Sequence, residues 1–231
     1  RTSLLFGDKP WPIKPEICLE GGNVLLDRQG FAEPKHPLLS LRSTGIRNDV
    51  DLTSANATSA ATAQAARLAA LAMSRYPSYW PETVRALLVH EARWTERMRA
   101  HLDACETKSG RARLLRRYGW GVPTEEAVLT SSHRAVTMVV QDEFCPFDET
   151  YAMRELRLHS LPWPRDVLQS LGEADMRLRI TLSYFIEPSA TRRGWKGKYT
   201  YASYGLRFDL KAPTDINVCL LYTSPSPRDR G

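Results

Sequence analysis

The sequence is poor in cysteine and contains no long hydrophobic run. Four cysteines occur among 231 residues, and Cys18, Cys105 and Cys145 lie far apart, without the spacing of metal ligands. The fourth belongs to the final segment of the chain. Separated cysteines in an odd number favour free thiols in a reducing compartment, so we expect a cytoplasmic protein without a metal centre or a cofactor. The longest apolar run is far shorter than the ~20 residues of a membrane-spanning helix, so no membrane partner is expected.

The charge balance is basic. With 42% hydrophobic and 25% charged residues, the chain is long enough for one large or two small globular domains. Its net charge of +6 comes largely from arginines, including Arg97, Arg99, Arg111, Arg113, Arg116 and Arg117. No aromatic-interleaved or groove-reading motif accompanies these residues. A solvated helix face is therefore favoured over a nucleic-acid site.

A serine stands in front of an alanine-rich stretch. Residues 56–62 read Asn-Ala-Thr-Ser-Ala-Ala-Thr and lead into residues 63–73, which are mostly alanine and leucine. A serine hydroxyl at the start of a helix suits acyl transfer, because the backbone N–H groups and the positive helix end stabilise the negative charge of the attacked carbonyl oxygen. Serine or threonine before an apolar helix is also an ordinary N-cap, so the flanking sequence has to decide.

The flanking segments resemble those of the subtilisin-like serine proteases, the subtilases of peptidase family S8. Four segments occur in the family's order over about residues 11–130: a Lys-Pro-Glu strand ending in glycine (13–22), the serine segment, a Tyr-Pro turn with a following helix from Pro81, and a glycine turn before a last helix (118–128). The resemblance implies an α/β catalytic domain, a polypeptide substrate and Ser59 as the nucleophile that forms an acyl-enzyme. We expect Ser59 at the start of a buried helix running to about Ser74, with its hydroxyl facing an open cleft.

The sequence departs from the family pattern in two respects. Ala57 replaces the family's glycine, which is harmless if its φ is negative and strained otherwise. The family's histidine and aspartate precede the serine, but only His36 does so here, in a proline-flanked loop, and no aspartate before Ser59 has the family's context. Neither Asn23 nor Asn56 fits the oxyanion asparagine. The chain, which starts at Arg1, thus carries one member of the triad.

These absences predict a C-terminal fragment of a serine endopeptidase. We expect this chain to be inactive and the full-length protein to be active, since a serine without a base is a poor nucleophile. The alternative is a pseudoprotease, a binding or regulatory module without catalysis. Substrate specificity and calcium binding stay open.

The second half of the sequence changes from helical to alternating periodicity. Residues 135–140, 176–185, 199–204 and 206–210 read as strands, and a short helix with proline at its start and glycine at its end is expected within 162–172. We therefore divide the chain into a subtilase portion (1–132) and a β-rich domain (133–218), of the β-sandwich or jelly-roll kind. The second portion resembles the extension of a bacterial subtilase subfamily sometimes encoded beside an AAA-type ATPase, which makes such an ATPase the one protein partner implied.

The last residues resemble a sequencing artefact. Residues 219–231 match the conceptual translation of a transposase-type adapter, and we exclude them from the fold. A natural Ser-Pro-rich disordered tail is the alternative.

Overall fold

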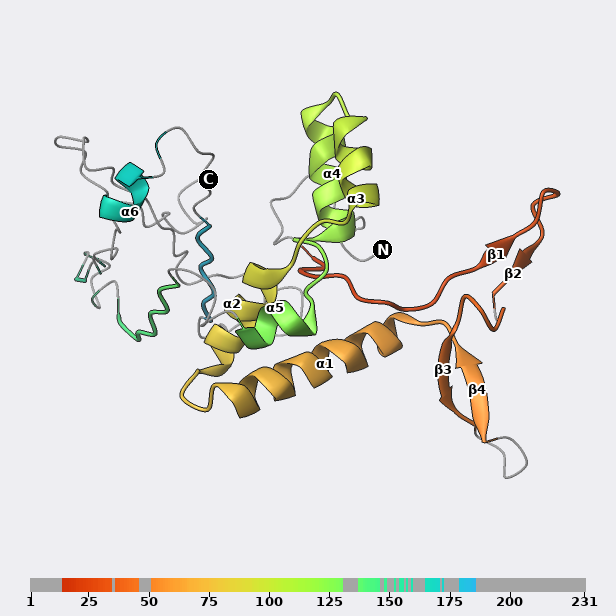
Figure 1. Ribbon diagram of the computed structural model, residues 1–231, viewed down its shortest axis with the longest axis horizontal. Coiled ribbons are helices and arrows are strands. Elements are labelled where there is room, and N and C mark those ends of the chain that lie inside the picture. The colour runs from red at the N-terminus through yellow and green to blue at the C-terminus, as the bar shows by residue number, and fades with distance from the viewer. Residues whose placement is uncertain are drawn as a thin grey trace.

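Helices dominate the part of the chain that the structure describes (Figure 1). The computed structural model describes residues 14–34, 36–45, 51–130, 137–145, 148, 152, 154–155, 157, 159, 165–170, 172 and 179–185. The helices are α1 (Thr58–Arg75), α2 (Pro81–Glu91), α3 (Glu96–Asp103), α4 (Lys108–Tyr118), α5 (Glu125–Thr130) and α6 (Arg165–Ser170). Among the described residues, none of the helices has the length and hydropathy of a membrane span.

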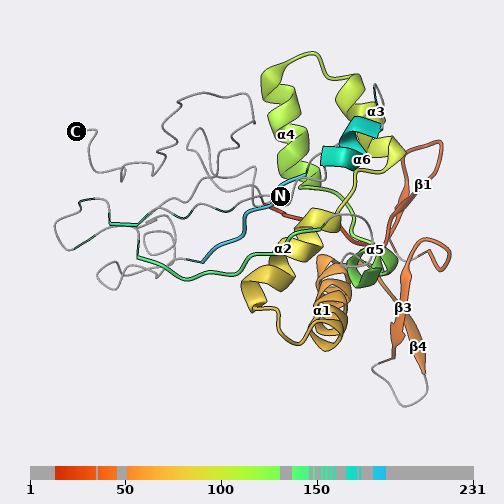
Figure 2. The same cartoon turned by 60° about the vertical axis from the view of Figure 1, so that its left-hand side comes forward.

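The core lies where α1, α2 and α5 meet, and Figure 2 shows these three helices side by side. Its buried residues are Leu68, Ala72, Tyr76, Val84, Leu87, Leu88 and Val128. The chain turns from α1 into α2 at Tyr76, whose hydroxyl donates to Leu129 O at 2.8 Å. Pro81 begins α2, where its lack of an N–H does no harm.

Helix α1 is buried along one stripe only. It runs from Thr58 to Arg75, close to the predicted bounds, but only Leu68 and Ala72 along it are buried. The expectation of a buried helix therefore holds, among the described residues, for this stripe alone. The small side chains of the alanine-rich stretch leave much of its outer surface without an apolar partner there.

Two small antiparallel hairpins precede α1 (Figure 1). Strand β1 (Leu25–Leu26) pairs with β2 (Ala32–Glu33), and β3 (Leu41–Thr44) pairs with β4 (Leu52–Ala55). Leu41 lies opposite Ala55, so the second hairpin ends directly before the serine segment. The predicted strand at 14–22 is not assigned as one among the described residues. Its backbone instead contacts the glycine turn, with Cys18 N donating to Gly121 O at 2.8 Å.

Helices α3 and α4 form a separate helical hairpin. Each begins at a threonine N-cap, Thr95 and Thr107, whose hydroxyl accepts from Met98 N at 3.3 Å and from Gly110 N at 3.1 Å. Gly119 ends α4 at φ 55°, and a Cβ there would clash with Glu16 O. The arginine-rich segment thus lies largely on exposed faces of α3 and α4.

The predicted β-rich domain stays a prediction. Beyond residue 133 the described residues contain α6, inside the range predicted for a short helix, and none of them is assigned to a strand. Much of the predicted strand pattern, including 199–204 and 206–210, lies outside the described residues, as does the tail at 219–231. A subtilase portion with helices and small strands is compatible with the predicted α/β class.

Candidate functional site

Ser59 is the second residue of α1 and is exposed to solvent. The sequence predicted this position at the start of the helix. No side chain caps the helix here, and among the described residues no group accepts a hydrogen bond from the backbone N–H of Ser59. The first turn therefore keeps a donor free for an oxygen of a bound molecule.

Ala57 causes no backbone strain. It is the N-cap residue of α1, with φ −160° and ψ 152°. This is extended backbone, which any residue adopts. The alanine that replaces the family's glycine is therefore compatible with the geometry of the serine loop.

The side chain of Asn56 fixes the loop three residues before the serine. Its Nδ2 donates to Asn23 O at 2.6 Å and also to Pro34 O. Its Oδ1 is buried, with no donor among the described residues. The amide thus ties the start of α1 to both ends of the β1–β2 hairpin, and its N–H groups are not available to a substrate oxygen.

The segment before this hairpin lies against the same helix end. Gly22 has φ +83°, and a Cβ at this residue would clash with Asn56 Oδ1. A Cβ at Gly21 would lie 3.2 Å from Ala57 O, and Gln64 Nε2 donates to Glu20 O at 2.6 Å. Gly21 and Gly22, which precede β1, and Gln64 of α1 therefore hold the serine loop in place.

No described histidine contacts Ser59. His36 Nδ1 accepts from Leu38 N at 3.3 Å, and the rings of His90 and His101 bond to Thr181 Oγ1 at 2.9 Å and to Tyr118 OH at 2.6 Å. His159 is exposed and His133 lies outside the described residues. Within the described part of the chain, the serine therefore has no hydrogen-bonded base.

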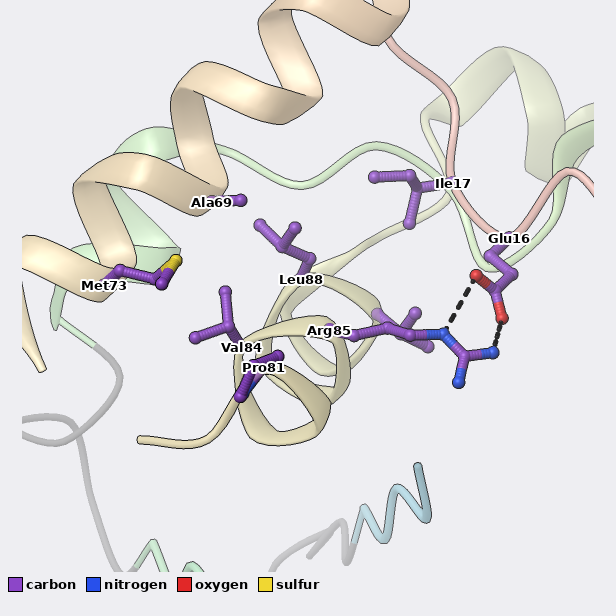
Figure 3. Close-up of a pocket in the computed structure, with 9 residues that line it drawn as sticks. Glu16, Ile17, Ala69, Met73, Pro81, Val84, Arg85 and Leu88 are labelled. Carbon is purple, nitrogen blue, oxygen red and sulfur yellow. Dashed lines mark hydrogen bonds and ion pairs between the residues drawn. The ribbon is translucent and has the colours of Figure 1, made fainter. Parts of the chain in front are cut away.

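An apolar groove lies farther along α1, between it and α2 (Figure 3). It has a volume of about 260 Å³ and is lined by side chains including Ala69, Met73, Val84 and Leu88. At its edge Arg85 forms an ion pair with Glu16, and Figure 3 shows the two hydrogen bonds between them. The groove is apart from the serine loop in sequence and contains no serine or histidine.

The charges at this edge favour the ionised carboxylate. Lys14 Nζ lies 3.0 Å from Glu16 Oε2, on the same carboxylate that Arg85 holds. Burial alone raises the pKa of Glu16, but the hydrogen bonds and charges of Arg85 and Lys14 outweigh it and lower the pKa below its usual value. Glu16 is therefore an anionic link between the first described segment and α2.

The described residues offer no metal site and no activated thiol. Within the described ranges, no group of three or more His, Cys, Asp or Glu side chains is placed to hold a metal ion. Burial raises the pKa of the Cys18 thiol, so this group stays protonated at neutral pH. Ser59, the nucleophile that the sequence predicted, is exposed to solvent.

Sequence reasoning missed the residues that hold the serine loop. Asn56 was weighed only as an oxyanion donor, and Gln64 lies within the stretch of residues 63–73 that was described only as mostly alanine and leucine. The available signals were the Gly21-Gly22 pair, typical of close backbone approach, and a polar residue among alanines. Neither signal names the partner, because the contacts join residues as far apart as 20 and 64.

A comparison with family models agrees with the motif order. The model described as the subtilase family matches residues 2–121, just over half of the chain. Searches of curated proteins and of solved structures found no match.

Proposed function

Since the chain belongs to the subtilase family of peptidases, we propose that Ser59 is the nucleophile of a serine endopeptidase that cleaves polypeptides. The observation that carries the proposal is the exposed serine in the first turn of α1, beside a backbone N–H without an acceptor among the described residues. The base and its orienting carboxylate are assigned to residues outside this sequence, because no residue here fits the family's motifs for them.

The chemistry follows from this arrangement. A base removes the proton of the Ser59 hydroxyl while Oγ attacks the carbonyl carbon of the scissile peptide. The carbonyl oxygen becomes an anion, and the N–H of Ser59 at the positive end of α1 donates to it. The tetrahedral intermediate collapses as the base returns its proton to the leaving amine. Water then hydrolyses the acyl-enzyme and restores the serine.

The role of the loop contacts is to fix where this N–H points. A displacement of about 1 Å in a catalytic group reduces rates by ~100-fold. Asn56 and Gly22 hold the loop through polar and steric contacts, which are directional. They support the site without touching the reacting atoms.

A binding or regulatory module without catalysis is the second candidate. It is favoured by one observation: no described histidine is hydrogen-bonded to Ser59. In such a module the serine loop would be part of the fold but would take no part in a reaction. The two candidates differ in what the complete gene product does.

The test compares this chain with the complete gene product, each with and without Ser59→Ala. Both are treated with a fluorophosphonate probe and assayed on casein. We expect the complete protein to be labelled at Ser59 and to hydrolyse casein, and the present chain to do neither, because loss of triad members reduces kcat by up to ~10⁶-fold. Ser59→Thr is the matched control for folding, since it keeps a hydroxyl in the helix.

Each other result has a defined meaning. Labelling of the present chain would show that it contains a base. A complete protein whose casein hydrolysis is indifferent to Ser59→Ala would refute the proposed nucleophile, and one that neither labels nor hydrolyses would favour the binding module.

A further inference from the structure

Residues beyond the family match cap the beginning of α2. Gln141 Oε1 accepts from the backbone N–H of Trp80, the N-cap residue, at 2.6 Å and from Thr83 Oγ1 at 2.6 Å. Its Nε2 donates to Ser78 O at 3.1 Å. One amide thus makes three hydrogen bonds to the start of one helix, and α2 has no cap from its own N-cap side chain.

Arg85 joins the middle of α2 to a second distant segment. One guanidinium nitrogen donates to Ser183 Oγ at 3.3 Å and to Tyr184 O at 3.5 Å, and its carbon lies 5.3 Å from the centre of the Phe185 ring. The other nitrogens bind Glu16. Because the donors of a guanidinium group form a planar fork, Arg85 can bind both partners at once.

The same segment reaches the end of α2. Arg179 donates to His90 O at 2.6 Å and to Ala92 O at 3.0 Å. Arg93 donates to the same two carbonyls, at 2.6 and 3.1 Å, so two arginines meet at this helix end. Thr181 Oγ1 bonds to His90 Nδ1 at 2.9 Å. Residues 179–185 therefore run antiparallel to α2, from its last turn to Arg85.

We propose that the outer face of α2 is a docking surface for the second half of this same chain. Three residues, which we call the anchors, make the contacts. Gln141 of the docked part binds the start of α2, Arg85 of α2 binds residues 183–185, and Arg179 of the docked part binds the end of α2. The occupants are residues 137–145 and 179–185, both outside the family match that ends at residue 121. The surface holds the added part of the chain to the part that bears Ser59, whether or not Ser59 is catalytic.

The anchors also predict how docking is lost. Apolar burial contributes little, since Leu182 is 42% exposed and Phe185 is 61% exposed. Docking depends instead on polar hydrogen bonds, several of them donated by a guanidinium group, and such charge-assisted bonds are stronger than neutral ones. Removing one guanidinium therefore opens the segment without emptying the apolar core.

The test is limited proteolysis of the full 231-residue chain by chymotrypsin, with cleavage after Tyr184 followed by mass spectrometry. The variants are Arg85→Gln and Arg179→Gln, and the matched control is Arg67→Gln, which removes an ion pair between α1 and Glu125 of α5. Cleavage of a docked segment tracks the population of its open form. We expect about tenfold faster cleavage in the two variants and a change of less than about twofold in the control.

Hydrogen exchange of the α1, α2 and α5 amides reports whether the core remains folded. If Arg85→Gln unfolds it, by leaving Glu16 without its arginine, Arg179→Gln decides alone, because Arg179 lies outside α1, α2 and α5 and donates to the carbonyl oxygens of His90 and Ala92 at the end of α2. Unchanged cleavage in Arg179→Gln with an intact core would overturn the proposal. So would wild-type cleavage as fast as that of a free peptide with the sequence of residues 179–187.

Discussion

The two ends of α1 are held in different ways. Toward its C-terminal end, Leu68 and Ala72 are 6% and 0% exposed and lie in the core with α2 and α5. At its N-terminal end Ser59 is exposed, and the preceding loop is held by the amide of Asn56 and by close contact with Gly22. One end is stabilised by burial and the other is positioned by polar contacts.

The difference follows from what each kind of interaction can do. Burial of apolar surface is strong but non-directional, so it stabilises a helix without fixing how its end is oriented. Hydrogen bonds contribute less net free energy but constrain distance and angle. A serine that has to stay accessible cannot be fixed by burial, so polar contacts hold its loop from behind.

The largest expected effect is at the buried end. Leu68→Ala leaves a cavity among Ala72, Val84 and Leu88, and the free energy of unfolding should fall by about 2–5 kcal/mol. Met73→Ala is the control, because Met73 is on the same helix but is 50% exposed. Urea denaturation measures both. Equal losses in the two variants would mean that the core does not lie on the Leu68 face.

A smaller effect is expected at the serine end. Gly22→Ala forces a Cβ into Asn56 Oδ1 and strains a residue at φ +83°, whereas Gly30→Ala has a similar φ of +85° but meets nothing within 4 Å. We expect Gly30→Ala to lower the free energy of unfolding by ~1 kcal/mol and Gly22→Ala by about 1–2 kcal/mol more. The difference between the variants isolates the contact with Asn56. If the two losses are the same, that contact does not hold the loop.

These two ends also mark how far the sequence could predict the molecule. The Tyr-Pro turn predicted a helix from Pro81, and α2 begins at that residue. The serine segment gave the start of α1 to within a residue. Such patterns are local in the sequence, and local propensity together with periodicity is enough to predict them.

The contacts of the serine loop could not be predicted in the same way. Asn56 to Asn23 and Gln64 to Glu20 join residues 33 and 44 positions apart, and one amide side chain does not reveal its partner. The anchors on α2 are farther apart still, since Arg85 and Ser183 are separated by 98 positions. Ser59 stays a predicted nucleophile, because none of the described histidines is hydrogen-bonded to it.

Ala57→Ser would give the N-cap of α1 a side chain that can accept a hydrogen bond, which Ala57 cannot do. Ala57 caps α1 without a side-chain hydrogen bond, and its backbone is already extended as an N-cap requires. Ala57→Ser should therefore raise the free energy of unfolding by about 0.5–1 kcal/mol, because its hydroxyl can accept a first-turn N–H. Ala57→Val is the control without a side-chain acceptor, because valine ranks with alanine as a poor N-cap and its expected change is small. A Val variant stabilised as much as the Ser variant would show that the gain does not come from capping.

The smallest effect is a pH dependence on the α2 side of the molecule. Burial lowers the pKa of His90 below its ordinary value of 6.5, and the charges of Arg179 and Arg93 lower it further, while Glu91 opposes them. As the pH falls below 6.5, the unfolded chain therefore binds this proton first, and the folded state loses stability. Glu16, whose pKa is also lowered, keeps its contribution until the pH falls below its ordinary 4.5.

The two groups thus destabilise the fold in separate pH windows, and variants can separate them. His90→Gln keeps a hydrogen-bonding group near Thr181 but cannot be protonated, so the free energy of unfolding should fall less between about pH 7 and pH 5 than in the wild type. Glu16→Gln should leave that window unchanged and flatten the profile below about pH 4.5. Urea titrations at each pH give both profiles. A His90→Gln profile parallel to the wild type above pH 5 would show that His90 is not buried between α2 and residues 179–181, and would count against the docked arrangement of the second half.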